Sequence, residues 1–340
     1  MGRVEPREPP PRLRNDFVRE HVHTVLTARV APAYKPTTMK RIWTTSLAVS
    51  LLVLPACKGG ASADAVKLIP DEAEFIVGMN PKTITGSDLY KEFSSEFEKE
   101  DDFKEAMKAF EDCGLKPTEF DAIVVGASQS EDFVAVIVGD GIGEDDNASC
   151  VIKNIQKMSG EDEAAEVSKE DGKKIIQFTD GRAYLVNKNM LALSTTEWET
   201  KVGELIDGKG TPAIENGKKD LYGKVDSKAA VWFIADVPAE LAGMAAMAAP
   251  EATEVKTVAG SVDLSKGVAV EFVAGFGDDA KAKATADKIQ ELFDGLKGEA
   301  PAELKGVVES VKIEAAGPDV KLGVSASMDD IKAGKDSMPI

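Results

Sequence analysis

Histidine is nearly absent from this 340-residue chain: His21 and His23 are its two histidines, so residues 57–340 contain none. Histidine is the commonest general base near neutral pH and the commonest metal ligand. Cysteine is also scarce, with three residues, whereas a structural zinc site usually needs four Cys or His ligands. We therefore expect no metal site, no cofactor and no enzymatic activity.

Basic residues are in deficit, and arginine above all. Residues 57–340 hold 32 Lys and Arg against 55 Asp and Glu, a net charge of −23, and Arg182 is their single arginine. This charge repels nucleic-acid phosphates and anionic lipid headgroups, and no arginine cluster is present to bind phosphate through paired hydrogen bonds. We expect no nucleic-acid partner; the plain interpretation of the acidity is the solvated surface of an exported protein.

Near the N-terminus lies an apolar run that is too short to span a bilayer. It covers thirteen residues, Ile42 to Leu54, whereas a transmembrane helix needs about 20. The run follows the basic Met39-Lys40-Arg41 and ends in Leu54-Pro55-Ala56-Cys57. This order resembles the signal peptide and lipobox of bacterial lipoproteins. The alternative is a plain signal peptide or an uncleaved anchor.

The resemblance implies how the N-terminal part is organised. Residues 1–38 fit no part of a signal peptide and are expected to be disordered, the product of a start codon upstream of the true one. Residues 39–56 are then the signal peptide, and residues 57–70 the acylated Cys57 with a Gly/Ala/Ser tether. Two or more acyl chains hold a protein firmly at a membrane. Because Lys58 rather than Asp follows the cysteine, the expected location is the outer membrane of a bacterial cell envelope, facing the periplasm or the cell surface.

Hydrophobic periodicity predicts an α+β body with antiparallel sheets. Strands are expected at 74–79, 120–127, 132–139, 165–168, 174–178, 183–186, 190–194, 229–237, 255–264, 267–275, 307–315 and 320–327. Helices are expected at 87–97, 101–114, 147–158, 196–207, 238–249 and 278–296.

The order of these elements recurs. The segments SEDFVAVIVGDGIGEDDNASCVIKNIQ and SKGVAVEFVAGFGDDAKAKATADKIQ share a hairpin, a Gly-rich acidic turn and a helix ending in Ile-Gln. They predict two repeated β-α-β-β-α-β units, residues 71–208 and 219–335, joined by a linker at 209–218, with helices packed on one face of antiparallel sheets. Chance similarity of two ordinary α+β stretches is the alternative. In this respect the body resembles uncharacterised exported α+β repeat proteins of bacteria, a resemblance that implies no function.

Two cysteines and one helix supply the remaining candidate sites. Cys113 and Cys150 fall near the end of one expected helix and the start of another, and export permits oxidation, so a disulfide is expected; two buried thiols are the alternative. Met244 and Met247, with Trp232, are candidates for a groove that binds an apolar ligand, because methionine adapts to irregular shapes. The alternative is that all three are ordinary core residues.

Two glycine-rich stretches suggest phosphate binding only superficially. Residues 203–209, GELIDGK, have the bare spacing of a phosphate-binding loop, but Gly210 stands where Ser or Thr is needed and the stretch ends a helix. Gly139, Gly141 and Gly143 precede a helix, but the acidic residues around them repel a pyrophosphate.

The expectation for function is a membrane-anchored envelope lipoprotein without enzymatic activity, which binds a protein partner or has a structural role. The alternative is a carrier or sensor of an apolar ligand held in a groove between sheet and helices. A hydrolase that uses two carboxylates is a third possibility, although none of the 55 acidic residues is singled out by its pattern.

Overall fold

A computed structural model describes residues 60–97, 101–158, 160, 165–238, 254–298, 300, 301 and 304–337. The strands are β1 (Phe75–Met79), β2 (Ala122–Ala127), β3 (Phe133–Val138), β4 (Ser168–Glu170), β5 (Lys173–Phe178), β6 (Gly181–Asn187), β7 (Met190–Thr195), β8 (Val231–Asp236), β9 (Thr257–Asp263), β10 (Val268–Gly275), β11 (Lys312–Ala316) and β12 (Asp319–Ala326). The helices are α2 (Ala61–Ala65), α3 (Pro81–Gly86), α4 (Asp88–Phe97), α5 (Asp101–Glu111), α6 (Asp145–Met158), α7 (Glu199–Ile206), α8 (Lys219–Tyr222), α10 (Asp279–Lys297), α11 (Lys305–Ser310) and α12 (Met328–Ser337).

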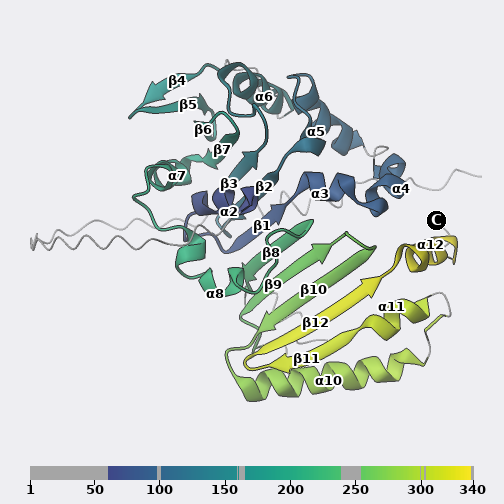
Figure 1. Cartoon of the computed structure of the whole chain (residues 1–340). Helices are drawn as coiled ribbons and strands as arrows, with labels where there is room; N and C mark the ends of the chain where they lie inside the picture. Colours follow the sequence, from purple (N-terminus) through teal and green to yellow (C-terminus); the bar gives the residue numbers. More distant parts are fainter. Residues whose placement is uncertain are drawn as a thin grey trace, which may run out of the picture. The chain divides into compact units, whose positions relative to one another are not determined.

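The strands form one antiparallel sheet in the order β11-β12-β10-β9-β8-β1-β2-β3-β7-β6-β5-β4 (Figure 1). The predicted α+β class and antiparallel pairing are confirmed. At the centre β1 pairs with β8, with Val77 opposite Phe233, so the sheet runs without a break from the first half of the chain into the second. The predicted helix at 238–249 lies outside the described residues apart from its first position.

Apolar side chains are buried on both faces of the sheet. On one face α2, α7 and α8 cover a main core that includes Ile76, Val134, Val136, Trp232 and Ile234. On the other face α6 covers a second core, and α10 covers a third at β10 and β12. The prediction that helices pack on one face was wrong. In the inner strands consecutive residues such as Leu191 and Ala192 are both apolar. Because consecutive side chains of a strand point to opposite faces, both faces of the sheet are apolar there and both must be covered.

The segment expected to be a tether is mostly structured. Helix α2 and the 3₁₀ turn Val66–Leu68 occupy it, and Ala65 and Val66 are fully buried in the main core. The expected linker at 209–218 is packed too: Pro212 bridges to Pro70, and Ala213 is fully buried. The composition of these two segments suggested a flexible spacer, but their small apolar residues fill space beneath α7 and α8. Any free tether after Cys57 ends by Gly60.

Local sequence accounts for most element ends. The Ser87 hydroxyl accepts a hydrogen bond from the Tyr90 amide at 3.1 Å and so caps α4. After α5 the chain turns at Gly114, whose φ of +75° suits glycine. The strand expected at 307–315 begins later, because residues 305–310 form α11 and β11 starts at Lys312. Among the described residues no helix is both long and apolar enough to cross a bilayer.

Candidate functional site

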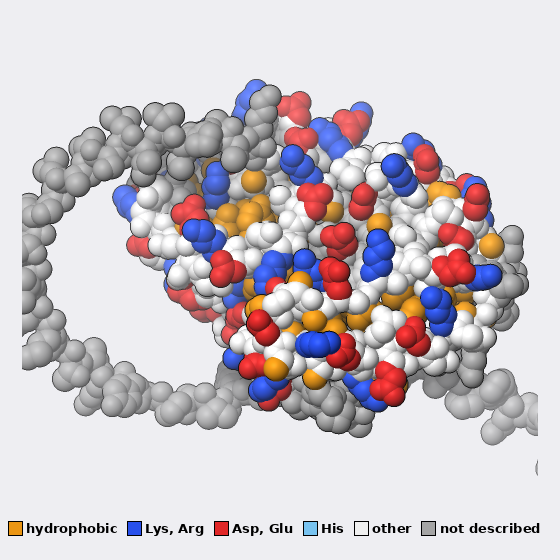
Figure 2. Space-filling view, turned by 60° about the horizontal axis from the view of Figure 1, so that its bottom comes forward, with side chains coloured by type: hydrophobic (Ala, Val, Ile, Leu, Met, Phe, Trp, Pro, Cys, Tyr) orange, Lys and Arg blue, Asp and Glu red, His pale blue; other side chains and the backbone are white. Residues whose placement is uncertain are grey.

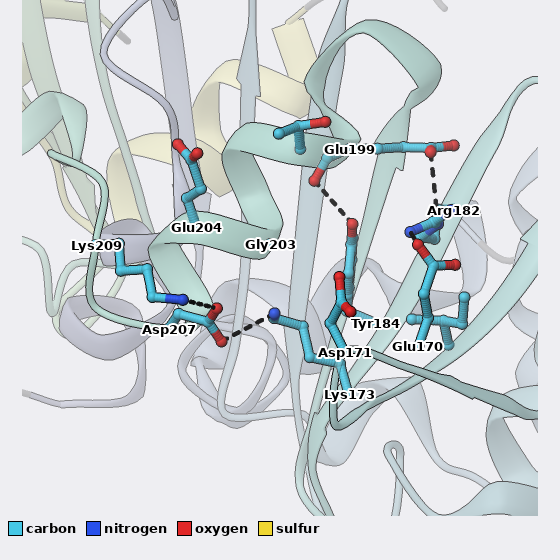
Figure 3. A pocket seen from close by; sticks show the side chains of 12 residues that line it. Glu170, Asp171, Lys173, Arg182, Tyr184, Glu199, Gly203, Glu204, Asp207 and Lys209 are labelled. Carbon is cyan, nitrogen blue, oxygen red and sulfur yellow. Dashed lines mark hydrogen bonds and ion pairs between the residues drawn. The ribbon is translucent and has the colours of Figure 1, made fainter.

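A polar cleft of about 370 Å³ opens beside β5, β6 and α7 (Figure 3). Charged side chains from the β4–β5 turn, from β6 and from α7 converge on it. Its lining residues are Glu170, Asp171, Lys173, Ile175, Arg182, Tyr184, Glu199, Thr200, Gly203, Glu204, Asp207 and Lys209. The stretch with the spacing of a phosphate-binding loop contributes Gly203, Glu204, Asp207 and Lys209, and it forms the end of a helix, as predicted.

Every cation of the cleft is paired with a carboxylate of the same cleft. Arg182 lies 3.1 Å from Glu170 and 3.4 Å from Glu199, with its guanidinium 5.9 Å from the centre of the Tyr184 ring. Lys173 and Lys209 each lie 2.9 Å from the Asp207 carboxylate (Figure 3). A phosphate or carboxylate ligand would have to displace one of these partners.

Ion pairs, hydrogen bonds and burial shift the pKa values of three groups in the cleft. Hydrogen bonds from Lys173 and Lys209 lower the pKa of Asp207. Burial raises the pKa of Tyr184, whose hydroxyl donates to the Glu199 carbonyl at 2.7 Å. Burial alone would lower the pKa of Arg182, but the negative charge of Glu199 and further contacts raise it overall. Each shift favours the form already present at neutral pH, so none of these groups is poised to exchange a proton there.

An apolar pocket of about 350 Å³ lies at the end of β1, between the sheet and the helices α3, α4 and α5. Both its floor and its walls are mainly hydrocarbon. The lining residues are Met79, Pro81, Ile84, Thr85, Tyr90, Ala106, Met107, Phe110, Pro117, Thr118 and Ile123. Eight of these eleven are apolar and none is charged. The volume is within the usual range of small-molecule pockets, roughly 300–1,000 Å³.

Of the three residues with hydroxyl groups that line the apolar pocket, Thr85 has its hydroxyl bonded within the protein. The Thr85 hydroxyl lies 3.0 Å from the Pro81 carbonyl and 3.1 Å from the Thr118 carbonyl, so its one proton is already donated. Met79 and Met107 are half-buried and approach from strand and helix respectively. The pocket can therefore take an apolar group.

The walls of the apolar pocket are held by contacts from outside it. Pro81 occupies the first turn of α3, where proline is preorganised for a helix. The ring of Phe110 on α5 packs edge-on against Phe120, with centroids 5.5 Å apart. At the end of α5, Cys113 forms the predicted disulfide with Cys150 on α6, with the two Cα atoms 5.7 Å apart. The position of α5 is thus tied covalently to the second core.

Of the three residues singled out for ligand binding, Trp232 is the one that the structure describes, and it does not lie at this pocket. Trp232 is fully buried in the main core, where its ring packs edge-on against Tyr222 with centroids 5.4 Å apart. It lines neither the polar cleft nor the apolar pocket. Cys57, Met244 and Met247 lie outside the described residues. In the sequence, the pocket residues Met107 and Phe110 lie at helical spacing, which indicates the apolar face of a helix but not a pocket.

The glycine-rich turn before α6 holds no open anion site. The Gly141 amide donates to the Asn189 side-chain oxygen at 3.2 Å, and the amides of Gly139 and Gly143 donate to backbone carbonyls of the β6–β7 turn. Within the described part of the chain, no three His, Cys, Asp or Glu side chains are placed to hold a metal ion. On the face drawn in Figure 2, acidic and basic side chains are interspersed, with no continuous basic patch.

Comparisons with known proteins add little. No family model matches the chain, and no curated protein matches it. Solved structures that are similar in arrangement include crystal forms III, I and IV of TP0453, with TM-scores of 0.46, 0.44 and 0.43 and identities of 9%, 11% and 8%. They cover 81%, 81% and 82% of this chain and 98%, 96% and 100% of their own. With every TM-score below 0.5, neither family nor function follows from this similarity.

Proposed function

We propose that this chain is a lipid-anchored protein of the bacterial cell envelope that holds an apolar ligand in the pocket between β1, β2 and helices α3 to α5. The observation that carries the ligand-binding part is the pocket itself: about 350 Å³, lined by eight apolar residues out of eleven and by no charged one. Open apolar surface of this kind costs free energy in water, and a bound apolar group recovers it.

The anchoring part rests on the order of basic start, apolar run and Leu54-Pro55-Ala56-Cys57. Acyl chains on Cys57 would hold a body of net charge −23 at a membrane without any basic surface. Mass spectrometry of the mature N-terminus is the direct test. We expect a peptide that starts at Cys57 and carries diacylglycerol, and a peptide in which unmodified Cys57 is still joined to Ala56 would refute the anchor.

Ligand binding can be tested without the anchor. A chain that begins at Lys58 keeps every described residue, including all three cores. Native mass spectrometry of this form, purified from an oxidising compartment, should show a co-purified apolar molecule. Ala106→Phe should abolish it, because Ala106 is an exposed residue at the pocket edge and a larger side chain there fills the space without repacking a core. Ala284→Phe, at an exposed alanine in the second turn of α10, is the matched control.

The second candidate function is recognition of a protein partner through the same pocket, with an apolar side chain of the partner as the occupant. The half-exposed Met79, Ile84 and Met107 favour it, because methionine-rich apolar surfaces can adapt to several partners. In the experiment above, an empty protein would argue for this second function and against a small-molecule ligand.

We further infer that the two halves are copies of one unit. In the first half β1, β2 and β3 are followed by α6, and the chain returns with β7 beside β3. In the second half β8, β9 and β10 are followed by α10, and the chain returns with β12 beside β10. An experimental structure should superpose the β3–α6 and β10–α10 segments with their Ile-Gln pairs aligned. A shifted register would favour chance similarity.

A further inference from the structure

From the position of the apolar pocket we infer the chemical class and the source of its ligand: one acyl chain of a phospholipid of the membrane to which the protein is anchored. This inference rests on the proposed function, and it adds what the ligand is and from which side it enters.

The pocket lies close to where the described chain begins. Gly60 to Ala63 border a hollow together with Asn80, Lys82 and Thr83. The Ser62 hydroxyl donates to the Asn80 side chain at 2.8 Å, which fastens the start of the body to the start of α3. The same helix contributes Pro81, Ile84 and Thr85 to the apolar pocket. The first described residue and the pocket therefore flank one short helix, whose diameter is about 10–12 Å.

Cys57 cannot be far from this helix. Gly60 is the third residue after Cys57, and three residues span at most about 10–11 Å when fully extended. Because the next residues are packed into the main core, no longer tether is available between Gly60 and the body. A lipid-anchored Cys57 would therefore hold this end of the sheet, and the pocket with it, at the bilayer surface.

The lining of the pocket suits a hydrocarbon chain. Neither charge nor a convergent set of donors is present for a headgroup, so the polar end of the ligand must remain outside. Met79 and Met107 are unbranched and can follow an unbranched chain. Each buried methylene is worth about 0.8 kcal/mol, which corresponds to roughly a fourfold gain in affinity. For saturated fatty acids of increasing length, the dissociation constant of the Lys58 form should fall about fourfold per added methylene until the pocket is full.

The source of the ligand is tested with the full lipidated protein in phosphatidylcholine vesicles whose acyl chains carry bromine, a quencher of tryptophan fluorescence. Phe110→Trp places a reporter in the pocket wall, with Met107→Trp as a second reporter should the first variant not fold. We expect brominated lipid to quench the reporter. Gln129→Trp, in the turn after β2 at the opposite end of that strand, should not be quenched.

Adding Ala106→Phe to the reporter separates uptake from mere contact with the surface. Quenching that disappears with Ala106→Phe and persists with Ala284→Phe supports uptake of a lipid chain. Quenching that persists with Ala106→Phe means contact without uptake and overturns the inference. A reporter that is never quenched also overturns it. That second result is the one expected if the acyl chains of Cys57 itself fill the pocket. If the Lys58 form co-purifies with an apolar molecule but shows no dependence on fatty-acid length, the proposed function stands and this inference fails.

Discussion

Removing the disulfide should destabilise the protein substantially. Cys113 and Cys150 are 37 residues apart in sequence, and closing a loop of this size lowers the entropy of the unfolded chain. In the chain-entropy model the bond is worth about 4 kcal/mol. A double Cys113→Ser/Cys150→Ser variant should lose this amount from a total free energy of unfolding that is typically about 5–15 kcal/mol. Packing should change little, because the Asn154 side chain still donates to the Ala109 carbonyl at 2.9 Å and keeps α6 against α5.

The measurement is urea unfolding of the Lys58 form, followed by tryptophan fluorescence and by far-ultraviolet circular dichroism. Trp198 and Trp232 are both buried in the main core, so their fluorescence reports on the whole body rather than on α5 alone. The m-value should rise in the variant, because an unfolded chain without the crosslink exposes more surface. The wild type in a reducing buffer is the control and should match the variant. A loss below about 1 kcal/mol, with the wild type shown by mass to be oxidised, would refute the loop-entropy account.

Three further predictions concern single side chains. Gly78→Ala should lower the free energy of unfolding by roughly 1–3 kcal/mol in a thermal unfolding assay, because an added Cβ would lie 2.2 Å from the buried Trp232 ring. The control in this assay is Gly86→Ala, whose added Cβ meets nothing within 4 Å. The two lysine partners of Asp207 lower the pKa of its carboxyl group in the folded protein. The stabilisation by this carboxylate is therefore present above the ordinary Asp pKa of about 3.9, and it is lost as the pH falls through the lower pKa of the folded state. Nuclear magnetic resonance titration should show the lowered pKa, and Asp207→Asn should flatten the acid limb of the stability curve. Ser87→Ala removes the cap of α4 and should cost about 1 kcal/mol by urea unfolding; an unchanged midpoint would contradict the capping role.

Much of the secondary structure could be predicted because it follows from local rules. The strand at 75–79, the capped helix after Ser87 and the long helix before 297 each have a clear period and a clear boundary residue. The prediction failed for residues 61–68, where Gly, Ala and Ser suggested a flexible tether. Small residues are also the ones that fit beneath helices in a crowded core, and composition alone does not distinguish these two uses.

The candidate site was harder to predict than the fold. Met107 and Phe110 follow a helical period, which identifies an apolar face but not how much of that face a neighbour covers. Trp232 and the pocket residue Met79 sit on adjacent strands and are equally apolar, yet one is fully buried and the other half-buried. Gly78 pairs with Trp232 and Met79 with Val231, 152 positions further along the chain, so Met79 lies on the opposite face of the sheet from Trp232.

The sequence by itself determined the acidic charge, the lack of histidine after residue 23, the lipobox-like motif at Cys57 and the positions of most strands and helices, since these depend on composition and on contacts within a few residues. Tertiary structure alone decided that the two halves share one sheet, that helices cover both of its faces and that an apolar pocket remains open at the end of β1. These features depend on which distant segments meet, and a pocket is the space that such segments leave unfilled. Local periodicity carries no information about that space.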